Sequence, residues 1–415
     1  MKKISTRGIL ALVLVWVWSF LGAVVASAQV STAPAQISMP ALDMRFTNPQ
    51  CKAYGDKPKN SFCTRDDLPR NQANPEGPFQ QVVSLIRDRQ NVKITLGTMT
   101  FSHKEIAAEL CKVIRRGVRV EVLIDSGAEA ATAEQVRACG GELFSIGVAE
   151  AEDEPRGDLH HNKFLLVERR NDSVLVFATA NFSNPGLTIN HETWGFVTDK
   201  KESPLMRHHQ CLIESLKRYT DNLRRFGRDM SNCGINYPRN SKMEALFVPA
   251  DSPKLLKLIE DEMRRSSRVL MTSNRYSFAR ITKAFGSSKA TDRRAVFDDD
   301  LYWGGLQPIE GYEREAVDAR SVSGLERTGV SVRFTQTSFG AAQKMHNKFI
   351  VLDNMVIVGA GNYTGGGLLK NFENFYIIRD RDTIAAFASQ FDYLWSISSS
   401  RRQMPATYWD PGVRP

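Results

Sequence analysis

The chain has 415 residues, of which 42% are hydrophobic and 24% are charged. It is too long for one ordinary domain, suits two domains or one duplicated unit, and has a composition that excludes an intrinsically disordered protein. The formal net charge of +9 is mildly basic and its paired basic residues are scattered, so the charge permits an anionic substrate without requiring one.

The first 28 residues have the pattern of a secretory signal peptide. Basic residues such as Lys2 precede an apolar run from Ile9 to Val25, and Ala26-Ser27-Ala28 supplies the small residues that a signal peptidase recognises. The alternative is an uncleaved anchor, because the run is nearly long enough to span a bilayer. The cleavage pattern favours removal of residues 1–28. We therefore expect a periplasmic or secreted mature chain without a transmembrane segment.

Residues 29–78 are rich in Pro, Asn, Gln and Asp and show no periodicity, so we expect an irregular segment. From residue 79 onward, helical and strand patterns alternate, and the strand–helix–strand order implies a right-handed crossover. The expected elements are helices that include 82–86 and 106–114, and strands that include 92–96, 118–124, 161–167 and 174–178.

The second half repeats this order, with a linker near 234–242 and a long loop over 286–320 that contains Tyr302 and Trp303 and could overhang a site. We expect an α/β fold with two pseudo-symmetric lobes, each a largely parallel sheet flanked by helices, and an active site between them. The lobes would span 79–240 and 241–400, followed by a tail over 401–415. The expected elements of the second half are helices at 255–263 and 278–285, and strands at 267–272, 330–334, 346–352 and 356–358.

Six cysteines follow the expected cleavage site, and an even number in an exported chain suggests disulfides. Pairing between sequence neighbours is the simplest arrangement, although Cys111 and Cys139 could equally be small buried hydrophobic residues. The expected pairs are Cys51–Cys63, Cys111–Cys139 and Cys211–Cys233.

One set of polar residues occurs twice in the same order. Eleven positions separate Asn from Glu in both copies, whereas His and Asn are twenty positions apart in the first copy and sixteen in the second. A longer hairpin at 169–173 would absorb that difference. The two sets are His161, Lys163, Asn181 and Glu192, and His346, Lys348, Asn362 and Glu373.

These residue types suit phosphoryl transfer. Residues two apart on a strand share a face, so each lysine lies beside its histidine, and burying that lysine is costly unless an anion meets it. Lysine and asparagine would stabilise the non-bridging oxygens of a phosphate diester, while a glutamate would orient each imidazole. One histidine can attack phosphorus while the other protonates the leaving oxygen and then activates water. The pattern predicts metal-independent cleavage of a phosphodiester at one site.

Each piece also has a plainer interpretation. A single His-x-Lys is usually exposed, the Asn tripeptides are common in turns, and the glutamates could be surface charges. Recurrence in the same order favours the site. His160 is expected to face away from it, and His191, His208 and His209 lack the partners of a metal site, so we expect no metal and no cofactor.

On these residues the chain resembles the phospholipase D superfamily, which is marked by paired HxKxxxxD motifs, over about residues 79–400. The second copy matches the motif through Asp353, whereas the first has Glu168 at the Asp position. The resemblance implies a structural role for these two carboxylates. It also implies that Glu192 and Glu373 orient the histidines.

The family has a small hydroxyl residue two positions before the Asn, and the resemblance implies that it contacts the phosphate. Thr179 supplies this hydroxyl in the first copy, but the second copy has Ala360. Because the first-copy histidine more often attacks in the family, we assign His161 as the nucleophile and His346 as the acid and then the base.

Proteins that the chain resembles cleave phospholipids, transfer phosphatidyl groups or cut nucleic acids, and the fold does not decide among these. We expect hydrolysis of phospholipid head-group diesters, with peripheral membrane contact, because export and the aromatic residues of 286–320 suit it. The alternatives are a metal-independent nuclease, which the basic charge suits, a phosphatidyltransferase, and an inert binding module, against which the intact motif argues. One monomer suffices for one site.

Overall fold

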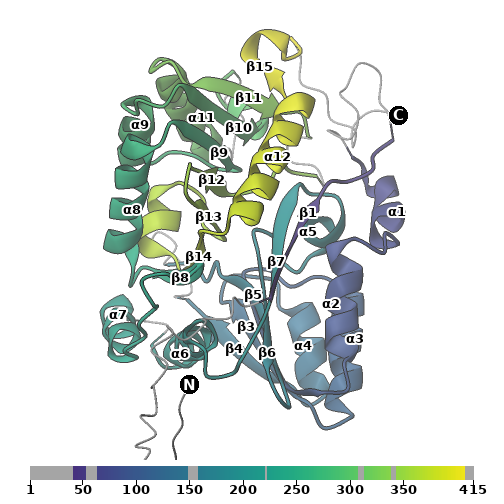
Figure 1. Cartoon of the computed structure of the whole chain (residues 1–415). Helices are drawn as coiled ribbons and strands as arrows, with labels where there is room; N and C mark the ends of the chain where they lie inside the picture. The colour runs from purple at the N-terminus through teal and green to yellow at the C-terminus, as the bar shows by residue number, and fades with distance from the viewer. Residues whose placement is uncertain are drawn as a thin grey trace, which may run out of the picture. The chain divides into compact units, whose positions relative to one another are not determined.

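Two β-sheets with the same order of strands form the framework of the protein (Figure 1). The computed structural model describes residues 41–52, 63–147, 158–219, 222–306, 313–337 and 343–406. The first sheet has the order β1-β7-β6-β5-β2-β3-β4, and the second has the order β8-β14-β13-β12-β9-β10-β11 with β15 added at its edge. The strands of the first sheet are β1 (Ala41–Thr47), β2 (Asn91–Thr98), β3 (Arg119–Asp125), β4 (Glu142–Ile146), β5 (Lys163–Arg169), β6 (Ser173–Ala178) and β7 (Glu192–Asp199).

The second sheet repeats each pairing of the first, which confirms two α/β lobes. In both lobes only two of the strand pairs are parallel, β2–β3 and β3–β4 in one and β9–β10 and β10–β11 in the other. The strands of the second sheet are β8 (Met243–Val248), β9 (Arg268–Ser273), β10 (Asp292–Asp298), β11 (Ser331–Thr335), β12 (Phe349–Val351), β13 (Val356–Gly359), β14 (Glu373–Ile378) and β15 (Ser399–Ser400).

The expectation of largely parallel sheets was therefore wrong. The motif strand and the two that follow it form an antiparallel meander, β5–β6–β7 in the first lobe and β12–β13–β14 in the second. Short connections allow only antiparallel neighbours, since a parallel pair needs a crossover of a dozen or more residues. Each lobe thus joins a parallel half with crossover helices to an antiparallel half that carries the motif.

The three largest hydrophobic clusters of the described residues hold the sheets and helices together. Helices α2, α3 and α4 cover one face of the first sheet, and α8, α9 and α11 cover one face of the second. Side chains from both sheets, α6 and α12 form the third cluster between the two lobes. These helices are α2 (Pro78–Arg87), α3 (Lys104–Ile114), α4 (Ala131–Ala138), α6 (Pro204–Arg218), α8 (Ser252–Arg265), α9 (Ala279–Gly286), α11 (Glu313–Glu326) and α12 (Arg381–Ile397).

The long interlobe helices begin where the sequence supplies N-terminal caps. Ser203 accepts a hydrogen bond from the backbone N–H of Met206, and Pro204 occupies the first turn of α6. Asp380 accepts one from the N–H of Thr383 at the start of α12. The remaining short helices are α1 (Leu68–Gln72), α5 (Asn184–Thr188), α7 (Leu223–Asn232), α10 (Asp300–Trp303), the 3₁₀ turns η1 (Arg65–Asp67) and η3 (Arg401–Gln403), and the π-helix η2 (Gly366–Lys370).

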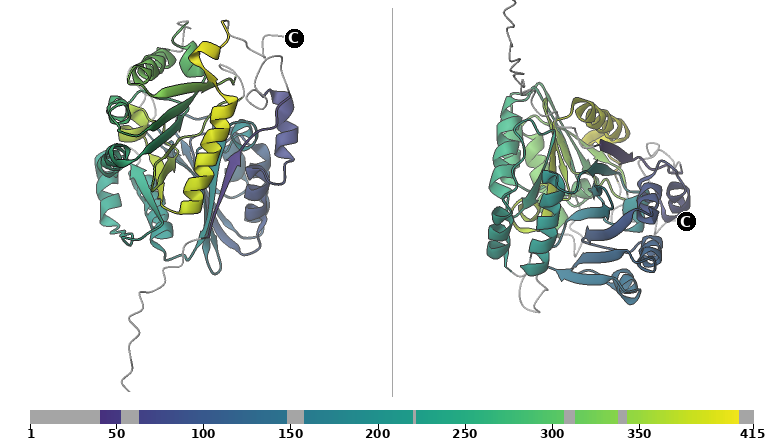
Figure 2. Two further views of the ribbon diagram at one scale, coloured as in Figure 1. Left: turned by 45° about the horizontal axis from the view of Figure 1, so that its top comes forward. Right: turned by 60° about the horizontal axis from the view of Figure 1, so that its bottom comes forward.

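The sequence suggested an irregular segment over 29–78, but part of this segment is regular. Residues Ala41–Thr47 form β1, which pairs antiparallel with β7 at the edge of the first sheet. Phe46 from β1 packs edge to face on Phe387 of α12 at a centroid distance of 5.1 Å, and both views of Figure 2 show β1 (purple) beside α12 (yellow). The first lobe therefore begins well before residue 79. A single short strand at a sheet edge gave too little periodicity to be recognised.

The prediction of a long loop over 286–320 is also wrong. This segment contains β10 and α10 and leads into α11. β10 and α11 take the places in the second lobe that β3 and α4 have in the first. Tyr302 and Trp303 are buried in the core of the second lobe and do not overhang the site. The acidic run at 298–300, which interrupts the apolar pattern, hid the strand.

The structure forms all three expected disulfides, Cys51–Cys63, Cys111–Cys139 and Cys211–Cys233. The expected linker lies between α7 and β8, and η3 begins the expected tail. The expected signal peptide, residues 1–28, lies outside the described residues. In the described part of the chain, no helix combines the length and the apolar character needed to cross a membrane.

Candidate active site

The two motif histidines lie at the interface of the lobes, and each meets the glutamate of the other copy. Nδ1 of His161 lies 2.7 Å from Oε2 of Glu373, and Nδ1 of His346 lies 2.8 Å from Oε1 of Glu192. A backbone hydrogen bond also connects the two lobes at this point, because the N–H of His161 donates to Phe372 O at 2.9 Å. With the proton on Nδ1, the Nε2 atom of each ring is left for chemistry.

This crossing arises from the meander in each lobe. The motif histidine precedes the first strand of the meander and the motif glutamate begins its third strand, so each lobe presents both groups at one edge. The residue before each glutamate forms an isolated bridge with the other lobe: Phe372 pairs with His160, and His191 pairs with Met345. One chain therefore brings His161, His346, Glu192 and Glu373 together, as the sequence predicted.

A second donor holds each glutamate in place. Nδ2 of Asn190 donates to Oε1 of Glu192, and Nδ2 of Asn371 donates to Oε1 of Glu373, both at 3.1 Å. We missed these asparagines in the sequence, although Asn-x-Glu occurs in both copies. That repetition was the available signal.

The Thr179 hydroxyl bonds to a motif carboxylate, and the phosphate contact expected of it stays a prediction. Its hydroxyl donates to Oε2 of Glu192 at 2.6 Å and accepts from the N–H of Thr193 at 2.9 Å. The hydroxyl therefore supports the carboxylate behind His346, whereas a phosphate contact was expected. Ala360 leaves Glu373 without the equivalent donor.

The motif lysines are fully buried, and each bonds to its own motif. Nζ of Lys163 donates to His161 O at 2.9 Å, and Nζ of Lys348 donates to His346 O at 2.7 Å. Each ammonium has further N–H groups for an anion. Burial lowers the pKa of Lys163 to about 8 and that of Lys348 to about 7, although the nearby glutamates favour the charged forms.

Burial also disfavours the charged forms of the motif glutamates and histidines. It raises the pKa of Glu192 to about 7 and that of Glu373 to about 8. Burial, and then the positive charge of the lysines, lowers the pKa of both motif histidines well below the ordinary value. A bound anion between the lysines would favour the protonated forms of the histidines and lysines.

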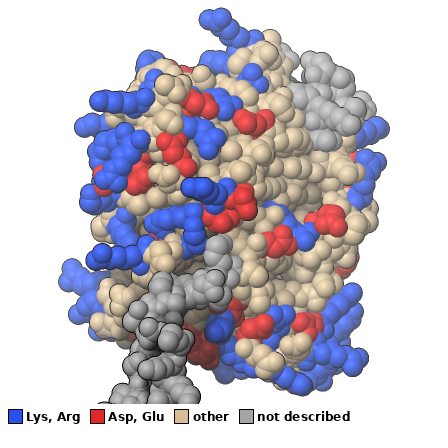
Figure 3. All heavy atoms as spheres, viewed as in Figure 1, with Lys and Arg blue, Asp and Glu red and all other residues tan. Residues whose placement is uncertain are grey.

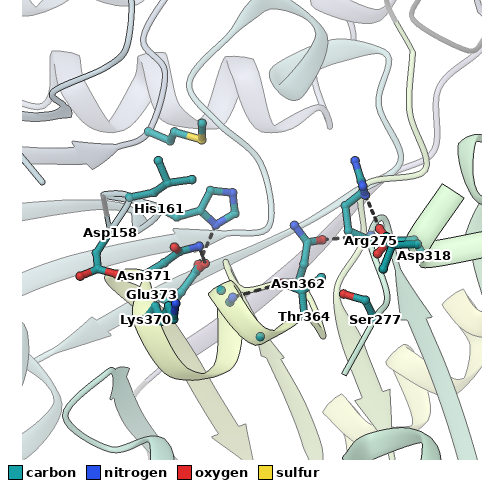
Figure 4. Close-up of a pocket in the computed structure, with 16 residues that line it drawn as sticks. Asp158, His161, Arg275, Ser277, Asp318, Asn362, Thr364, Lys370, Asn371 and Glu373 are labelled. Atoms are coloured by element: carbon teal, nitrogen blue, oxygen red, sulfur yellow. Dashed lines mark hydrogen bonds and ion pairs between the residues drawn. The ribbon is translucent and has the colours of Figure 1, made fainter. Parts of the chain in front are cut away.

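A cavity of about 560 Å³ opens beside His161, and Asn362 lines it (Figure 4). Oδ1 of Asn362 accepts from the N–H of Arg275 at 3.2 Å, so its amide nitrogen remains available. Arg275 forms an ion pair with the buried Asp318 on the far side of the cavity. Asn181 follows β6 as Asn362 follows β13, at the equivalent place in the first lobe.

The last carboxylates of the two motif strands lie at the other ends of those strands. Asp353 accepts from the backbone N–H groups of Ser267 and Arg268 at the start of β9. Glu168 lies 4.0 Å from Nζ of Lys93. These contacts fix strand ends and do not reach the histidines.

Histidines outside the motif are buried in the protein. His160 is fully buried, and His209 bonds through both ring nitrogens to Leu205 O and the Tyr376 hydroxyl. His208 bonds to the Tyr237 hydroxyl. Among the described residues, the group spaced to hold a metal is the acidic run Asp298–Asp300, which includes none of these histidines.

The charge balance of the site predicts pH-dependent anion binding. Sulfate keeps the same charge from pH 6 to 9, whereas the lysines lose protons near pH 7 and 8 and the glutamates lose theirs over the same range. All four changes make the site more negative. We expect sulfate affinity, measured by calorimetry at constant ionic strength, to fall at least about tenfold between pH 6 and 9. An affinity independent of pH would contradict this assignment of charges.

Comparison with known proteins agrees with this geometry. The sequence matches a family described as "Cardiolipin synthase, PLD-like domain" over residues 83–217 and 289–395, more than half of the chain. The mitochondrial cardiolipin hydrolase of Chlamydomonas reinhardtii is 32% identical over 90 residues, covering 21% of this chain and 39% of that protein. That of Xenopus tropicalis is 35% identical over 81 residues, covering 19% and 37%. The chain thus spans about two fifths of these relatives.

A solved structure shares the fold. The phosphatidylserine synthase of Haemophilus influenzae Rd KW20 superposes with a TM-score of 0.53 at 14% identity, covering 79% of this chain and 86% of that one. Each of the two segments that match the family contains one complete copy of the motif. The chain therefore belongs to the phospholipase D superfamily.

Proposed function

We propose that the protein is a metal-independent phosphodiesterase that hydrolyses phospholipid head-group bonds through a phosphohistidine intermediate. One observation carries the proposal: both imidazoles are held through Nδ1 by carboxylates of the opposite lobe, which leaves two Nε2 atoms beside two buried lysines. Two positioned imidazoles supply a nucleophile and an acid, and the lysines supply the charge stabilisation that a metal gives elsewhere. An inert binding module would not need this arrangement.

In the first step, Nε2 of His161 attacks phosphorus while His346 gives its Nε2 proton to the leaving oxygen. A phosphorus–nitrogen bond forms and the bond to the leaving group breaks. In the second step, neutral His346 takes a proton from water, whose oxygen displaces His161 from phosphorus. The products are the alcohol and a phosphomonoester, and both histidines return to their starting states.

The assignment of roles now rests on the carboxylates. Besides its histidine, Glu192 receives hydrogen bonds from the side chains of Thr179 and Asn190, whereas Glu373 receives one from Asn371. Hydrogen bonds to a carboxylate favour its ionised form, and an ionised carboxylate stabilises an imidazolium. This supports His346 as the acid and His161 as the nucleophile, for a reason other than the expected phosphate contact of Thr179.

Surface features near the cavity support a lipid substrate. Val317 lines the cavity, Leu369 is next to Lys370, which also lines it, and these two apolar side chains are 45% and 42% exposed. Leu369 also lines a hollow of about 600 Å³ with Arg224 and Arg228 of α7. Exposed aliphatic groups beside arginines suit a bilayer that carries anionic lipid.

Two further observations bear on the substrate. On the face drawn in Figure 3, acidic side chains are interspersed with basic ones, so the basic residues there form no continuous track for a nucleic-acid backbone. Both relatives described above by sequence are named mitochondrial cardiolipin hydrolases. A nuclease remains the second candidate because the chain is basic overall. An alcohol in place of water would make the enzyme a phosphatidyltransferase.

Export forms part of the proposal. The signal-peptide pattern and three disulfides support an oxidising compartment outside the cytoplasm. N-terminal sequencing of the exported protein checks this, with Gln29 expected as the first residue. An exported protein that begins at Met1 would contradict cleavage.

The function is tested by assaying the purified protein side by side on phosphatidylcholine vesicles, cardiolipin vesicles and plasmid DNA, with EDTA present throughout. We expect lipid head groups to be released and the DNA to remain uncleaved. His161→Ala and His346→Ala should each lower turnover at least about 1000-fold, and the double variant should be scarcely worse, because the two act as one unit. Turnover that EDTA abolishes and Zn²⁺ restores, or cleavage of DNA alone, would contradict the proposal.

The surface next to the cavity gives a separate test. Arg224→Glu/Arg228→Glu should weaken binding to vesicles with anionic lipid at least about tenfold, measured by cosedimentation, because each basic residue near the surface contributes about 1 kcal/mol. The matched control is Arg115→Glu/Lys289→Glu, which makes the same change in charge. Those exposed residues precede β3 and β10, at the ends of these strands opposite the site. Equal effects of the two double variants would contradict a specific membrane surface on α7.

A further inference from the structure

An aspartate ends the middle parallel strand of each lobe, and it makes the same two backbone contacts in both. In the first lobe, Oδ2 of Asp125 accepts from the N–H of His160 at 2.7 Å. Its Oδ1 accepts from the N–H of Gly127 at 3.1 Å. His160 immediately precedes the motif histidine, so this carboxylate bonds to the backbone one residue away from it.

The second lobe repeats the arrangement. Oδ2 of Asp298 accepts from the N–H of Met345 at 2.6 Å, and Oδ1 accepts from the N–H of Asp300 at 3.2 Å. Met345 immediately precedes His346. The hydroxyl of Thr337 donates to the same Oδ2 at 3.0 Å. The two carboxylates therefore contact the same backbone positions relative to their motifs, although the lobes differ in sequence around them.

These contacts join strands that are not neighbours. β3 and β5 are separated by β2, and β10 and β12 are separated by β9. Each aspartate spans the end of the intervening strand to reach the start of its motif. Both are buried, at 2% and 0% exposed, so each hydrogen bond is made away from competing water.

The next N–H along each motif is held from the other lobe. The N–H of His161 donates to Phe372 O at 2.9 Å, and the N–H of His346 donates to His191 O at 3.0 Å. Two successive backbone groups ahead of each imidazole are thus fixed, one by the aspartate of its own lobe and one by the strand that carries its glutamate partner. The aspartate fixes the position of the backbone that carries the imidazole, and the glutamate fixes the orientation of the ring.

We propose that Asp125 and Asp298 are a duplicated pair of positioning residues that set the place of the two histidines relative to each other. This inference rests on the proposed function, since it concerns the same reaction. A carboxylate is required because both of its oxygens accept hydrogen bonds. An asparagine has one acceptor oxygen, so it would leave a buried N–H facing an NH₂ group.

The test compares Asp125→Asn and Asp298→Asn with a matched control, Glu121→Gln. Glu121 is a fully buried acid on the same strand as Asp125, and it forms ion pairs with Lys93 and Lys217 without contacting the motif. On a soluble diester, bis(p-nitrophenyl) phosphate, the two Asp variants should lose about 10- to 100-fold in kcat, with KM changed less than about threefold. The control should lose stability and keep the kcat of its folded fraction.

A second readout does not depend on turnover. The Nδ1 proton signals of His161 and His346, recorded by NMR in histidine-labelled protein, should move in the Asp variants and stay in place in the control. If the wild-type protein cleaves no diester, the proposed function fails, whereas these signals still decide the positioning role. Thr337→Val removes the hydroxyl that contacts both Asp298 Oδ2 and Asp299 Oδ1. It leaves the Asp298 carboxylate in place and provides a milder variant should the Asp variants not fold; it should shift the His346 signal. Asp variants or Thr337→Val with unmoved signals and unchanged kcat would overturn the proposal.

Discussion

Each motif histidine is paired with a carboxylate that the other half of the chain supplies, and the rest of the site depends on this exchange. His161 meets Glu373 and His346 meets Glu192, at 2.7 and 2.8 Å. Neither lobe holds a complete pair by itself. The hydrophobic cluster between the sheets, to which α6 and α12 contribute, therefore determines the geometry of the chemistry as well as stability.

The exchange also answers an electrostatic difficulty. Two lysines, two glutamates and two histidines are removed from water at one interface, and burial disfavours the charged form of every one of them. Hydrogen bonds from Asn190, Asn371 and Thr179 stabilise the carboxylates, and backbone carbonyls receive the lysines. In the proposed reaction a phosphate diester would complete this arrangement, because its negative charge favours the protonated forms of the histidines and lysines.

Much of the fold and of the candidate site could be predicted from the sequence, and the predictions that were wrong have physical reasons. The repeated His-x-Lys, Asn and Glu predicted one shared site, and long apolar periods predicted most helices and strands. The crossing of Glu192 and Glu373 could not be read, because it depends on how the lobes face each other. Thr179 contacts Glu192, which only the register of β6 and β7 reveals. The acidic end of β10 concealed a strand, and β1 was too short to stand out.

The central claim is that the carboxylates cross between the lobes, and one measurement addresses it directly. The Nδ1 proton signals of both histidines can be compared by NMR in Glu373→Gln and Glu192→Gln. The account predicts that Glu373→Gln moves mainly the His161 signal and that Glu192→Gln moves mainly the His346 signal. If each substitution instead perturbed the histidine of its own half, the lobes would carry separate pairs and the account of one shared site would be contradicted.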